Sequence, residues 1–479
     1  YSYQKINLSS SNIEGSGFPS PSFQQLSVAA SILSAGTSLT ESALMSIFGR
    51  SNLSWDNKYL LSLSLRADGS SKFHPDKRWG YFPSVSAGWN ISSEPFWSLA
   101  GTTTKIRGSY GETGNQDGIS SYAYHAQMSG GRNYNNQSGI GVSTNGNRNL
   151  TWETARQYGA GLDLGLLGGK LNLTADYFIK KTDNLLYSKP EPSTSGFTSI
   201  ISNIGSMENK GWEFLVNAHV PLGAVQWSSD FNISFIKNKV TSLIGEEALL
   251  IGANMTLQVG QEVGSFYMYK QLGIYQSDQE VPESLYKNGV RAGDVMYEDL
   301  DGNGAINVSD RQIIGTANPN FYGGWNNSFS YKNFDFNIFF TYSHGNKVYA
   351  NYRANTDRLG SGFMNMTEQV ANERWSGPGT SNTTPRAIYG STWNTQNSSR
   401  FLEDGSYIRL RALNFGYTLP TQVANKIGMK RLRVYVQGDN LYLWTKYRGF
   451  DPEETSDFDP QYIGQDNLIL PQLRSFNVG

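Results

Sequence analysis

The feature that most constrains how this 479-residue chain can fold is a regular rhythm of hairpins. Segments of about ten residues alternate apolar and polar side chains, and the connections between them are very short and long in strict turn. In the segment 171–180, Leu171 and Tyr177 fall on one side of an extended chain and Asn172 on the other, because successive strand side chains point to opposite faces. The same period of two returns in the segments 212–220, 225–235 and 334–342. The sequence therefore predicts β-strands that each carry one apolar face.

The lengths of the connections distinguish between two kinds of all-β fold. Tight turns are predicted at Asp56-Asn57, Gly168-Gly169, Gly223 and Lys332-Asn333. The other connections are longer than compact soluble domains usually carry: 67–79, 111–151, 182–211, 237–320, 346–405 and 446–473. This pattern indicates an antiparallel up-and-down transmembrane β-barrel, with short periplasmic turns and long extracellular loops. Alternation alone also fits a water-soluble β-sandwich or barrel.

Composition narrows the class of protein further. The chain is 38% hydrophobic, 13% aromatic and only 16% charged, which argues against disorder. A net charge of -1 and a pI near 6.5 give no reason to expect nucleic acid as a partner. The absence of cysteine excludes disulfides and thiolate chemistry, and no apolar run reaches the roughly eighteen residues of a transmembrane helix. The four histidines are scattered and no HExxH, GxSxG or phosphate-binding GxxxxGKS/T motif occurs, so we expect a protein that is not an enzyme.

The organisation of the chain predicts part of a larger barrel. Residues 1–43 are expected to be a loop or a partial early barrel segment, and residues 44–479 to form transmembrane strands with long extracellular loops. The chain begins at Tyr1 without an initiator methionine or an apolar signal segment, so we expect that an N-terminal part has been removed. About thirteen strands are predicted, whereas a single-chain bacterial barrel needs an even number to close. The barrel is therefore not expected to close on this chain alone.

A series of short motifs resembles one family of outer-membrane proteins. LRADGSSKF at 65–73, RWGYFPS at 78–84 and GW at 88–89 are similar to the barrel signature of the SusC/RagA family. Further blocks in the family's order are KIRGSYG at 105–111 with GNQ at 114–116, NIG at 203–205 with ENKGWE at 208–213, GD at 293–294 with the acidic segment 299–310, YIRLR at 407–411 with GY at 416–417, and QGDNL at 437–441. The resemblance covers nearly the whole chain from about Leu44 onward.

The resemblance implies a TonB-dependent outer-membrane importer of Bacteroidetes. Such a barrel has twenty-two strands, is closed by an N-terminal plug and is capped by a SusD-like surface lipoprotein. The partners implied are that lipoprotein, the TonB complex acting through the missing N-terminal part, outer-membrane lipid, and a glycan or peptide substrate. Because this chain lacks the plug and the early strands of the pattern, it is not expected to transport by itself. A passive porin-type barrel and a soluble β-rich glycan-binding protein or adhesin are the alternatives.

A calcium-binding loop is the sharpest local motif. The spacing of an EF-hand loop is matched by oxygen ligands at Asp299, Asp301, Asn303, Ala305 through its carbonyl, Asn307 and Asp310. Gly304 occupies the sixth position, where the loop turns sharply, whereas Asp310 replaces the usual longer Glu at the twelfth. The alternative is an Asx-rich turn that satisfies its own backbone without a metal. The loop falls in the long outer connection 237–320, where bound Ca²⁺ would stiffen it for docking the lipoprotein.

Substrate contacts are expected from outer loops, where aromatic faces stack on sugars or peptide side chains and amides supply hydrogen bonds. The candidates are Tyr134, Asn135, Tyr352, Tyr389, Trp393 and Asn394, and for each of them loop packing is the competing interpretation. Arg409 and Arg411 alternate with apolar neighbours, which predicts a cationic stripe facing the lumen. For this stripe the favoured interpretation is solvated charge in a wet channel.

Overall fold

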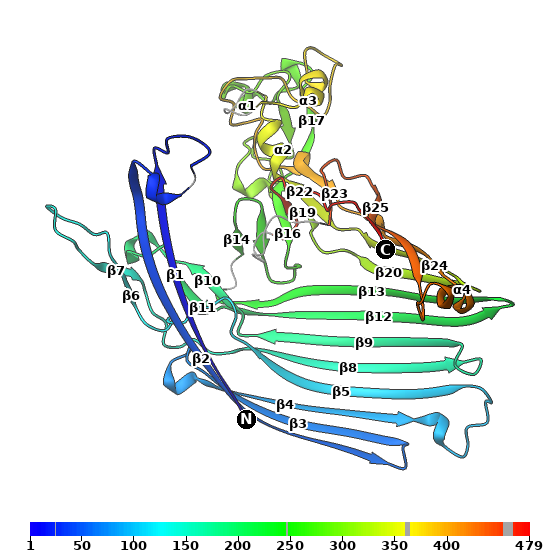
Figure 1. Cartoon of the computed structure of the whole chain (residues 1–479). Coiled ribbons are helices and arrows are strands. Elements are labelled where there is room, and N and C mark those ends of the chain that lie inside the picture. The colour runs from blue at the N-terminus through cyan, green and yellow to red at the C-terminus, as the bar shows by residue number, and fades with distance from the viewer. Residues whose placement is uncertain (24, 246–247, 360–364, 454–462) are drawn as a thin grey trace. The chain divides into compact units, whose positions relative to one another are not determined.

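The computed structural model describes residues 1–479 except 24, 246–247, 360–364 and 454–462 (Figure 1). The chain divides into two compact units. Unit 1 comprises Tyr1–Trp89, Arg107–Gly159 and Lys180–Met207, and unit 2 comprises Asn90–Ile106, Ala160–Ile179 and Glu208–Gly479. Five strands contribute residues to both units, namely β4 (Trp79–Asn90), β5 (Thr103–Asn115), β8 (Glu153–Leu166), β9 (Leu171–Asp183) and β12 (Gly205–Leu222).

One large antiparallel sheet contains fourteen of the described strands, which we call the wall strands. Their hydrogen-bonded order is β1-β2-β3-β4-β5-β8-β9-β12-β13-β20-β21-β24-β25-β27. Besides the five strands already given, they are β1 (Ser2–Ser16), β2 (Ser31–Trp55), β3 (Tyr59–Ser70), β13 (Val225–Leu243), β20 (Phe321–Tyr331), β21 (Phe334–His344), β24 (Tyr407–Thr418), β25 (Arg433–Thr445) and β27 (Ser475–Val478). Each wall strand therefore pairs with its predecessor in the sheet, as an up-and-down topology requires.

The predicted tight turns are confirmed. Asp56 and Asn57 have φ of 53° and 52°, the left-handed values that a two-residue hairpin turn needs, and Gly223 and Lys332 also have positive φ. The alternation of short and long connections predicts tight turns at this end of the strands. Two connections there, 91–102 and 419–432, are longer because each holds a short helix. The first contains η3 (Ile91–Ser93) and the second α4 (Thr421–Lys426).

The strand count differs slightly from the sequence prediction, and of the two alternatives for residues 1–43 the structure has strands of the large sheet. The sheet has fourteen described strands where about thirteen were predicted. Residues 1–43 hold β1 and the first half of β2, which pair over their length from Ser2↔Ser46 to Ser16↔Ser31. The expected boundary at residue 44 thus falls inside a strand, because polar serines along β1 hide its alternation.

Unit 1 shows the two faces of the wall strands in β4. Trp79, Tyr81 and Val85 are exposed, whereas Phe82 between them is buried with Trp152. A small core of Phe73, Phe82, Ile119, Leu150 and Trp152 closes the loops that follow β3 and β5. Gly114 is required here, because a Cβ at that position would lie 2.1 Å from the Phe82 ring. The hairpins β6 (Gln127–Ser129) to β7 (Gly141–Thr144) and β10 (Leu186–Pro190) to β11 (Ser199–Asn203) lie in the connections of this unit.

Unit 2 shows the same alternation over more strands. On β24 and β25, Ile408, Phe415 and Val436 are each about half exposed. The opposite face carries polar side chains that bond one another: Asn337 donates to Asn326 at 2.8 Å, and Arg433 donates to Asp335 at 3.0 Å. The apolar side chains of the wall strands are therefore directed away from protein, and the polar ones line the other face.

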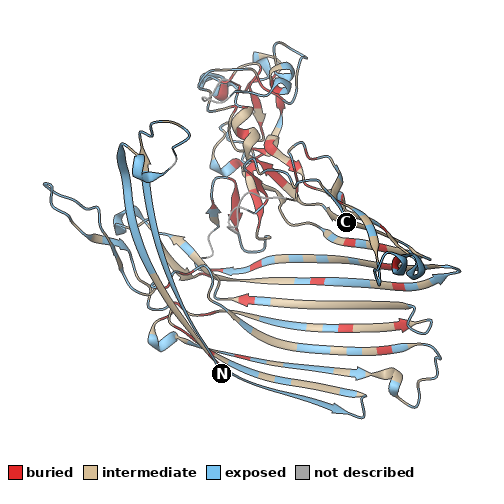
Figure 2. Ribbon diagram, in the orientation of Figure 1, coloured by how far each residue is buried: buried red, intermediate tan, exposed pale blue. Residues whose placement is uncertain are grey.

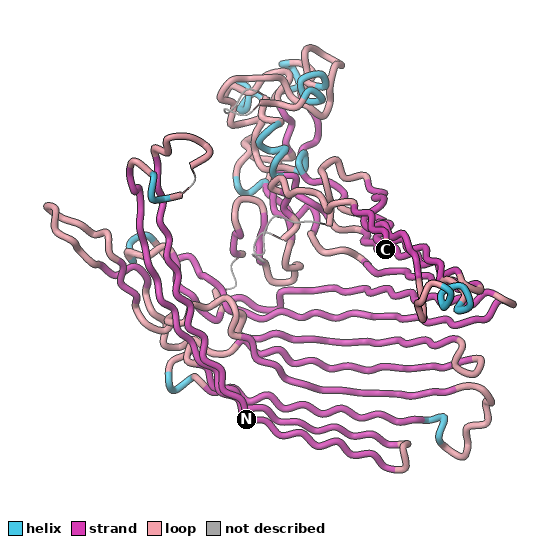
Figure 3. Tube along the Cα trace, viewed as in Figure 1, coloured by secondary structure: helices cyan, strands magenta, loops and turns pink. Residues whose placement is uncertain are grey.

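The long connections of unit 2 form a second, non-barrel layer of structure (Figure 3). Its strands are β14 (Leu249–Ile251), β15 (Met255–Leu257), β16 (Ser265–Tyr269), β17 (Gln271–Ile274), β18 (Val295–Tyr297), β19 (Arg311–Thr316), β22 (Lys347–Ala350), β23 (Leu402–Asp404) and β26 (Gln465–Asp466). Its helices are α1 (Glu283–Lys287), α2 (Asn351–Thr356) and α3 (Glu368–Glu373), with η5 (Asp278–Glu280), η6 (Val308–Asp310) and η7 (Ser399–Phe401). None of the helices in the described part of the chain is both long and apolar enough to cross a membrane.

Candidate functional site

The connections 248–320 and 346–405, without residues 360–364, fold together as one body, which we call the loop module. The backbone N–H of Val295 donates to the Asn394 side chain, and the Trp393 indole donates to the Val295 carbonyl, both at 2.9 Å. Tyr297 donates to the Trp393 carbonyl at 2.9 Å, and burial raises its pKa. Figure 2 shows that buried residues concentrate in this part of unit 2, in contrast to the long wall strands. The module therefore has a core of its own.

A buried ion pair joins the same two segments. Arg386 donates two parallel hydrogen bonds of 2.9 Å to Asp294, and Asn394 donates a third to the same carboxylate at 2.9 Å. Asp294 is 3% exposed, so its charge is compensated by a bidentate guanidinium and an amide. The Gly-Asp pair at 293–294 in the sequence motif thus holds the loop module together.

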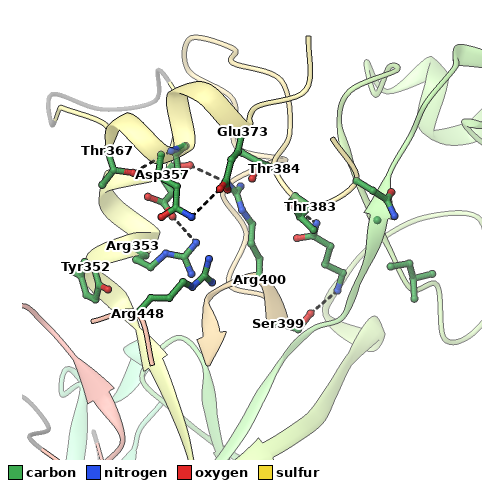
Figure 4. Close-up of a pocket in the computed structure, with 16 residues that line it drawn as sticks. Tyr352, Arg353, Asp357, Thr367, Glu373, Thr383, Thr384, Ser399, Arg400 and Arg448 are labelled. Atoms are coloured by element: carbon green, nitrogen blue, oxygen red, sulfur yellow. Dashed lines mark hydrogen bonds and ion pairs between the residues drawn. The ribbon is translucent and has the colours of Figure 1, made fainter. Parts of the chain in front are cut away.

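A cavity of about 540 Å³ opens in the loop module between β17, α2, α3 and η7 (Figure 4). Its floor includes Thr384 and Val370, which are buried, and its rim includes Leu272, Gln369 and Asn382, which are exposed. Most of the remaining lining is polar, with hydroxyl, amide and guanidinium groups. A volume of this size accommodates a small ligand of several rings or residues.

Three guanidinium groups converge on this cavity from separate parts of the chain (Figure 4). Arg353 on α2 pairs with Asp357 at 2.8 Å and also with Glu403. Arg448 pairs with the same Glu403 oxygen at 3.0 Å. Both carboxylates are nearly inaccessible to solvent, so these pairs are largely desolvated.

The third guanidinium, Arg400, differs from its neighbours. Its nitrogens donate to the backbone carbonyls of Asp357 at 3.3 Å and of Asn394 at 3.5 Å. No carboxylate of the described residues lies within ion-pair distance of it. Burial lowers the pKa of Arg400 to about 10, and although the Asp357 charge opposes that shift, the charges of Arg353 and Arg448 add to it. Arg400 is therefore a half-buried charged group in the cavity wall that makes no direct ion pair with any described residue.

The predicted substrate-binding residues lie in different environments. Tyr352 lines the cavity, and burial followed by the Glu403 charge raises its pKa to about 12, so its phenol stays protonated. Trp393 and Asn394 pack inside the loop module, with the hydrogen bonds described above. Tyr389 is 90% exposed. The structure does not bring these four residues together in one cavity, and ligand contact remains a prediction for each.

The other two candidates belong to unit 1. Tyr134 and Asn135 form the tip of the β6–β7 hairpin, where Tyr134 is 86% exposed and Asn135 has a φ of 47°. The backbone N–H of Tyr134 donates to the Gln137 carbonyl at 3.1 Å, which closes the tip as a tight turn. This turn accounts for the polar sequence around the two residues, and their contact with substrate stays a prediction.

The segment 299–310 brings three carboxylates together. Oxygens of Asp299, Asp301 and Asp310 lie within 4.8 Å of one another, and Asp310 is fully buried. The Asp299 carboxylate accepts hydrogen bonds of 2.8 Å from the N–H groups of Gly304 and Gly302, and these bonds lower its pKa, the Gly304 bond most.

The remaining positions of the calcium motif lie in the same loop. Asn303 and Asn307 accept from the backbone N–H groups of Ala305 and Ser309 at 2.8 and 2.9 Å. Asp310 accepts from the N–H groups of Leu300 and Asn307, and closes a capping box at the start of η6. The loop thus satisfies its own backbone, as the Asx-turn interpretation requires, and also gathers the acidic groups that the calcium interpretation requires.

The arginine stripe on β24 is not solvated, contrary to the favoured interpretation. Arg409 is 3% exposed and pairs with Asp451, while its Nε lies 3.0 Å from Glu453. Arg411 also pairs with Glu453. The strand has a bulge between Leu410 and Ala412, which turns Arg411 toward the same acidic segment. The connection after β25 therefore covers these charges, an arrangement that strand periodicity cannot reveal.

The sequence did not identify the arginine cavity. Arg353, Arg400 and Arg448 are separated by about fifty residues each and belong to no motif. The one local signal is the spacing of Arg353 and Asp357, which places the two charges on one side of a helical turn.

The exposed apolar face of the wall strands and the polar opposite face define a transmembrane β-barrel of the outer-membrane class. The family described as TonB dependent receptor-like, beta-barrel, matches residues 1–256, and the chain belongs to this family. Because its members are outer-membrane transporters, the predictions of an outer-membrane location and of a protein that is not an enzyme are confirmed.

Individual relatives agree with the resemblance to SusC and RagA. TonB-dependent receptor P3 of Formosa agariphila is 37% identical over the whole chain, which covers 49% of that protein. TonB-dependent receptor SusC of Bacteroides thetaiotaomicron is 31% identical over 88% of the chain and 42% of its own length. The structure of the RagAB peptide importer in its closed-closed state matches 99% of the chain and 52% of its own chain, with a TM-score of 0.81 and 25% identity. The chain thus spans about half the length of the relatives it matches.

Proposed function

We propose that this chain is the barrel portion of a SusC-like importer that takes up oligosaccharides or oligopeptides with a SusD-like surface lipoprotein. The observation that carries the proposal is the pairing of a lipid-compatible wall with a loop module that has its own buried core, in a chain of this family. The similarity to the RagAB importer and to SusC supports both the import activity and the lipoprotein partner. Import of this kind needs selective binding and a pull transmitted from TonB, and no bond-making in the barrel.

Affinity purification of the full-length protein from its native outer membrane tests the partnership. We expect a surface lipoprotein to co-purify in a fixed ratio and to be identified by mass spectrometry. We also expect uptake of labelled oligosaccharides or oligopeptides by the host to stop when TonB is deleted. Uptake that continues without TonB would contradict the importer and favour a passive porin.

Conductance distinguishes these two alternatives directly. Full-length protein in a planar lipid bilayer is expected to show no steady conductance, because an importer of this class is closed by a plug. A porin-type barrel would conduct as soon as it inserts. Protein that stays soluble without detergent would contradict both and favour the soluble glycan-binding alternative.

We propose further that the loop 299–310 binds Ca²⁺ and that the ion stiffens it for the lipoprotein. The convergence of three acidic side chains within 4.8 Å supports this, because hard oxygen ligands at this spacing suit calcium. Titration of the full-length protein with CaCl₂ alone is expected to release or absorb heat, and Asp301→Ala to remove that heat. Glu283→Ala, an exposed carboxylate on α1 outside the loop, is the control and should leave the heat unchanged. Absence of heat in the unaltered protein would contradict the proposal.

A further inference from the structure

The cavity described above has the character of a ligand site. Burying a charge without a counter-ion is costly, so desolvated guanidinium groups are normally paired. Arg353 and Arg448 follow this rule, because both contact Glu403. Arg400 differs: it is half-buried, makes two long hydrogen bonds to carbonyls and a contact with the Phe401 ring at 5.2 Å, and forms no ion pair within the described part of the chain.

The charges around Arg400 favour an anion. Of the three guanidinium groups beside the buried carboxylates of Asp357 and Glu403, Arg400 is the one with no ion-pair partner among the described residues. Glu373 also lines the cavity, where it is exposed and accepts a hydrogen bond from Gln369 at 2.9 Å. Because water screens an exposed carboxylate, Glu373 compensates a guanidinium in the wall only weakly. A negatively charged group of a ligand would complete the cluster.

The rest of the lining favours a ligand rich in hydroxyl groups. Thr367, Thr383 and Ser399 supply hydroxyls around the same space, and Gln369 and Asn382 supply amides. Figure 4 shows the labelled hydroxyl residues around the guanidinium groups, with Tyr352 at the edge. An extended peptide would instead be recognised through apolar pockets or a free sheet edge. A sugar ring needs several short polar groups and one aromatic side chain, and this cavity offers both.

We infer that this cavity binds the anionic substituent of an acidic oligosaccharide, with Arg400 as the group that contacts the carboxylate or sulfate. The inference rests on the proposed importer function for the delivery of the ligand, and it selects acidic glycans within the oligosaccharide branch of that proposal. Arg353 and Arg448 are positioning residues, because their guanidinium groups are already engaged by Glu403 and keep the wall positive.

Calorimetry on the detergent-purified full-length protein tests the inference without any transport step. The probes are trisaccharides of galacturonate, guluronate and glucuronate, a galactose-sulfate disaccharide, the methyl-esterified trisaccharides, and triglutamate. We expect at least one uronate or the sulfated sugar to bind, and the neutral esters not to bind. Binding of the uronate identifies a carboxylate ligand, and binding of the sulfated sugar alone identifies a sulfate ligand. Equal binding of the esters, binding of triglutamate alone, or no binding at all would overturn the inference.

Matched variants locate the site. Arg400→Met is expected to weaken the acidic sugar by at least about tenfold, because a charge-assisted hydrogen bond is lost. Arg291→Met removes the same charge from a residue that packs on Tyr286 outside the cavity, and should leave binding unchanged. Glu373→Gln alters only an exposed rim residue and is expected to strengthen binding about twofold, since it removes a repulsive charge.

The variants also separate this inference from the proposed function. If Arg400→Met fails to fold, two other measurements still test the site. One is the affinity of Glu373→Gln for the acidic sugar, and the other is the salt dependence of binding, because binding to a guanidinium must weaken as salt rises. Weakening by Arg291→Met as large as that by Arg400→Met would refute the site. Binding that follows these expectations in a protein whose uptake does not need TonB would refute the importer and leave the site intact.

Discussion

The wall strands and the loop module place similar side chains in opposite environments. On the wall, Phe415 and Val436 are each about half exposed, whereas in the module Phe266 and Val295 are completely buried. Strand periodicity is regular in the first region, while in the second the strands have three to six residues each. The apolar side chains of the wall face lipid, whereas those of the loop module pack against one another.

The largest expected effect comes from opening the core of the loop module. Phe266→Ala removes a ring that is fully buried and lies 6.5 Å from the Tyr349 ring. We expect a loss of about 3–5 kcal/mol in the stability of the module, because a cavity remains. Hydrogen exchange of β16 and β22 measures it. Phe415→Ala, on the wall, should leave that exchange unchanged, and equal effects of the two changes would erase the contrast between the regions.

A charge on the outer face of the wall is the next largest effect. Ile338 lies at the middle of β21, on the face of Phe334 and opposite to the polar Asn337. Ile338→Arg is expected to cost about 2–4 kcal/mol of folding stability in a lipid bilayer, since a cation would be placed among acyl chains. Equilibrium unfolding in vesicles measures the loss. Gln226→Arg, on the polar face, is the control, and a similar loss there would show that the two faces are not distinct.

A hydrogen bond between side chains on the outer face is expected to contribute less to the folding stability. Asn327 is 5% exposed because the Trp227 indole covers it and donates a hydrogen bond of 3.1 Å. Trp227→Phe keeps an aromatic ring and removes the donor, so we expect a loss of about 1–3 kcal/mol from the unsatisfied amide. The double variant Trp227→Phe with Asn327→Leu should recover most of this loss in the same unfolding assay. No recovery would mean that the cost arises from packing instead.

The smallest expected effect is the loss of stability of the loop 299–310 at low pH. Backbone hydrogen bonds hold the pKa of Asp299 below its usual 3.8 in the folded state. A carboxylate with a lowered folded pKa stabilises the loop above its unfolded pKa, and this stabilisation is lost as the pH falls through the folded value. Protection of the Gly302 and Gly304 amides should therefore fade below about pH 3.8. Asp299→Asn should remove this dependence, and protection that is flat with pH in the unaltered protein would contradict the assignment.

The sequence predicted the wall far better than the loop module, and the reason is physical. A period of two and a positive φ at Asp56, Asn57 and Gly223 are local properties, so each strand and each tight turn leaves its own trace in the chain. Contacts such as Val295 with Asn394 join residues about a hundred positions apart and leave no periodic signal. Trp393 and Asn394 were candidates for ligand contact because loop aromatics and amides look alike in sequence whether they bind or pack.

The candidate cavity illustrates the same limit. Its residue Tyr352 was identified as an exposed-loop aromatic, whereas Arg400 was not, because an arginine next to Phe401 carries no mark of burial in the sequence. The acidic segment 299–310 could be identified from the sequence, since all of its candidate ligands lie within twelve consecutive residues, and metal binding there stays a prediction.

The shared core of the two long connections has a consequence for grafting between barrels. The segment around Asp294 and Val295 and the segment around Arg386 and Trp393 each supply half of one folded body. Transplanting either segment by itself into a related barrel would cut that body in two and leave an unpaired acid or guanidinium behind. Transplanting both together keeps that body whole, so chimaeras between related barrels must inherit the two insertions as a pair.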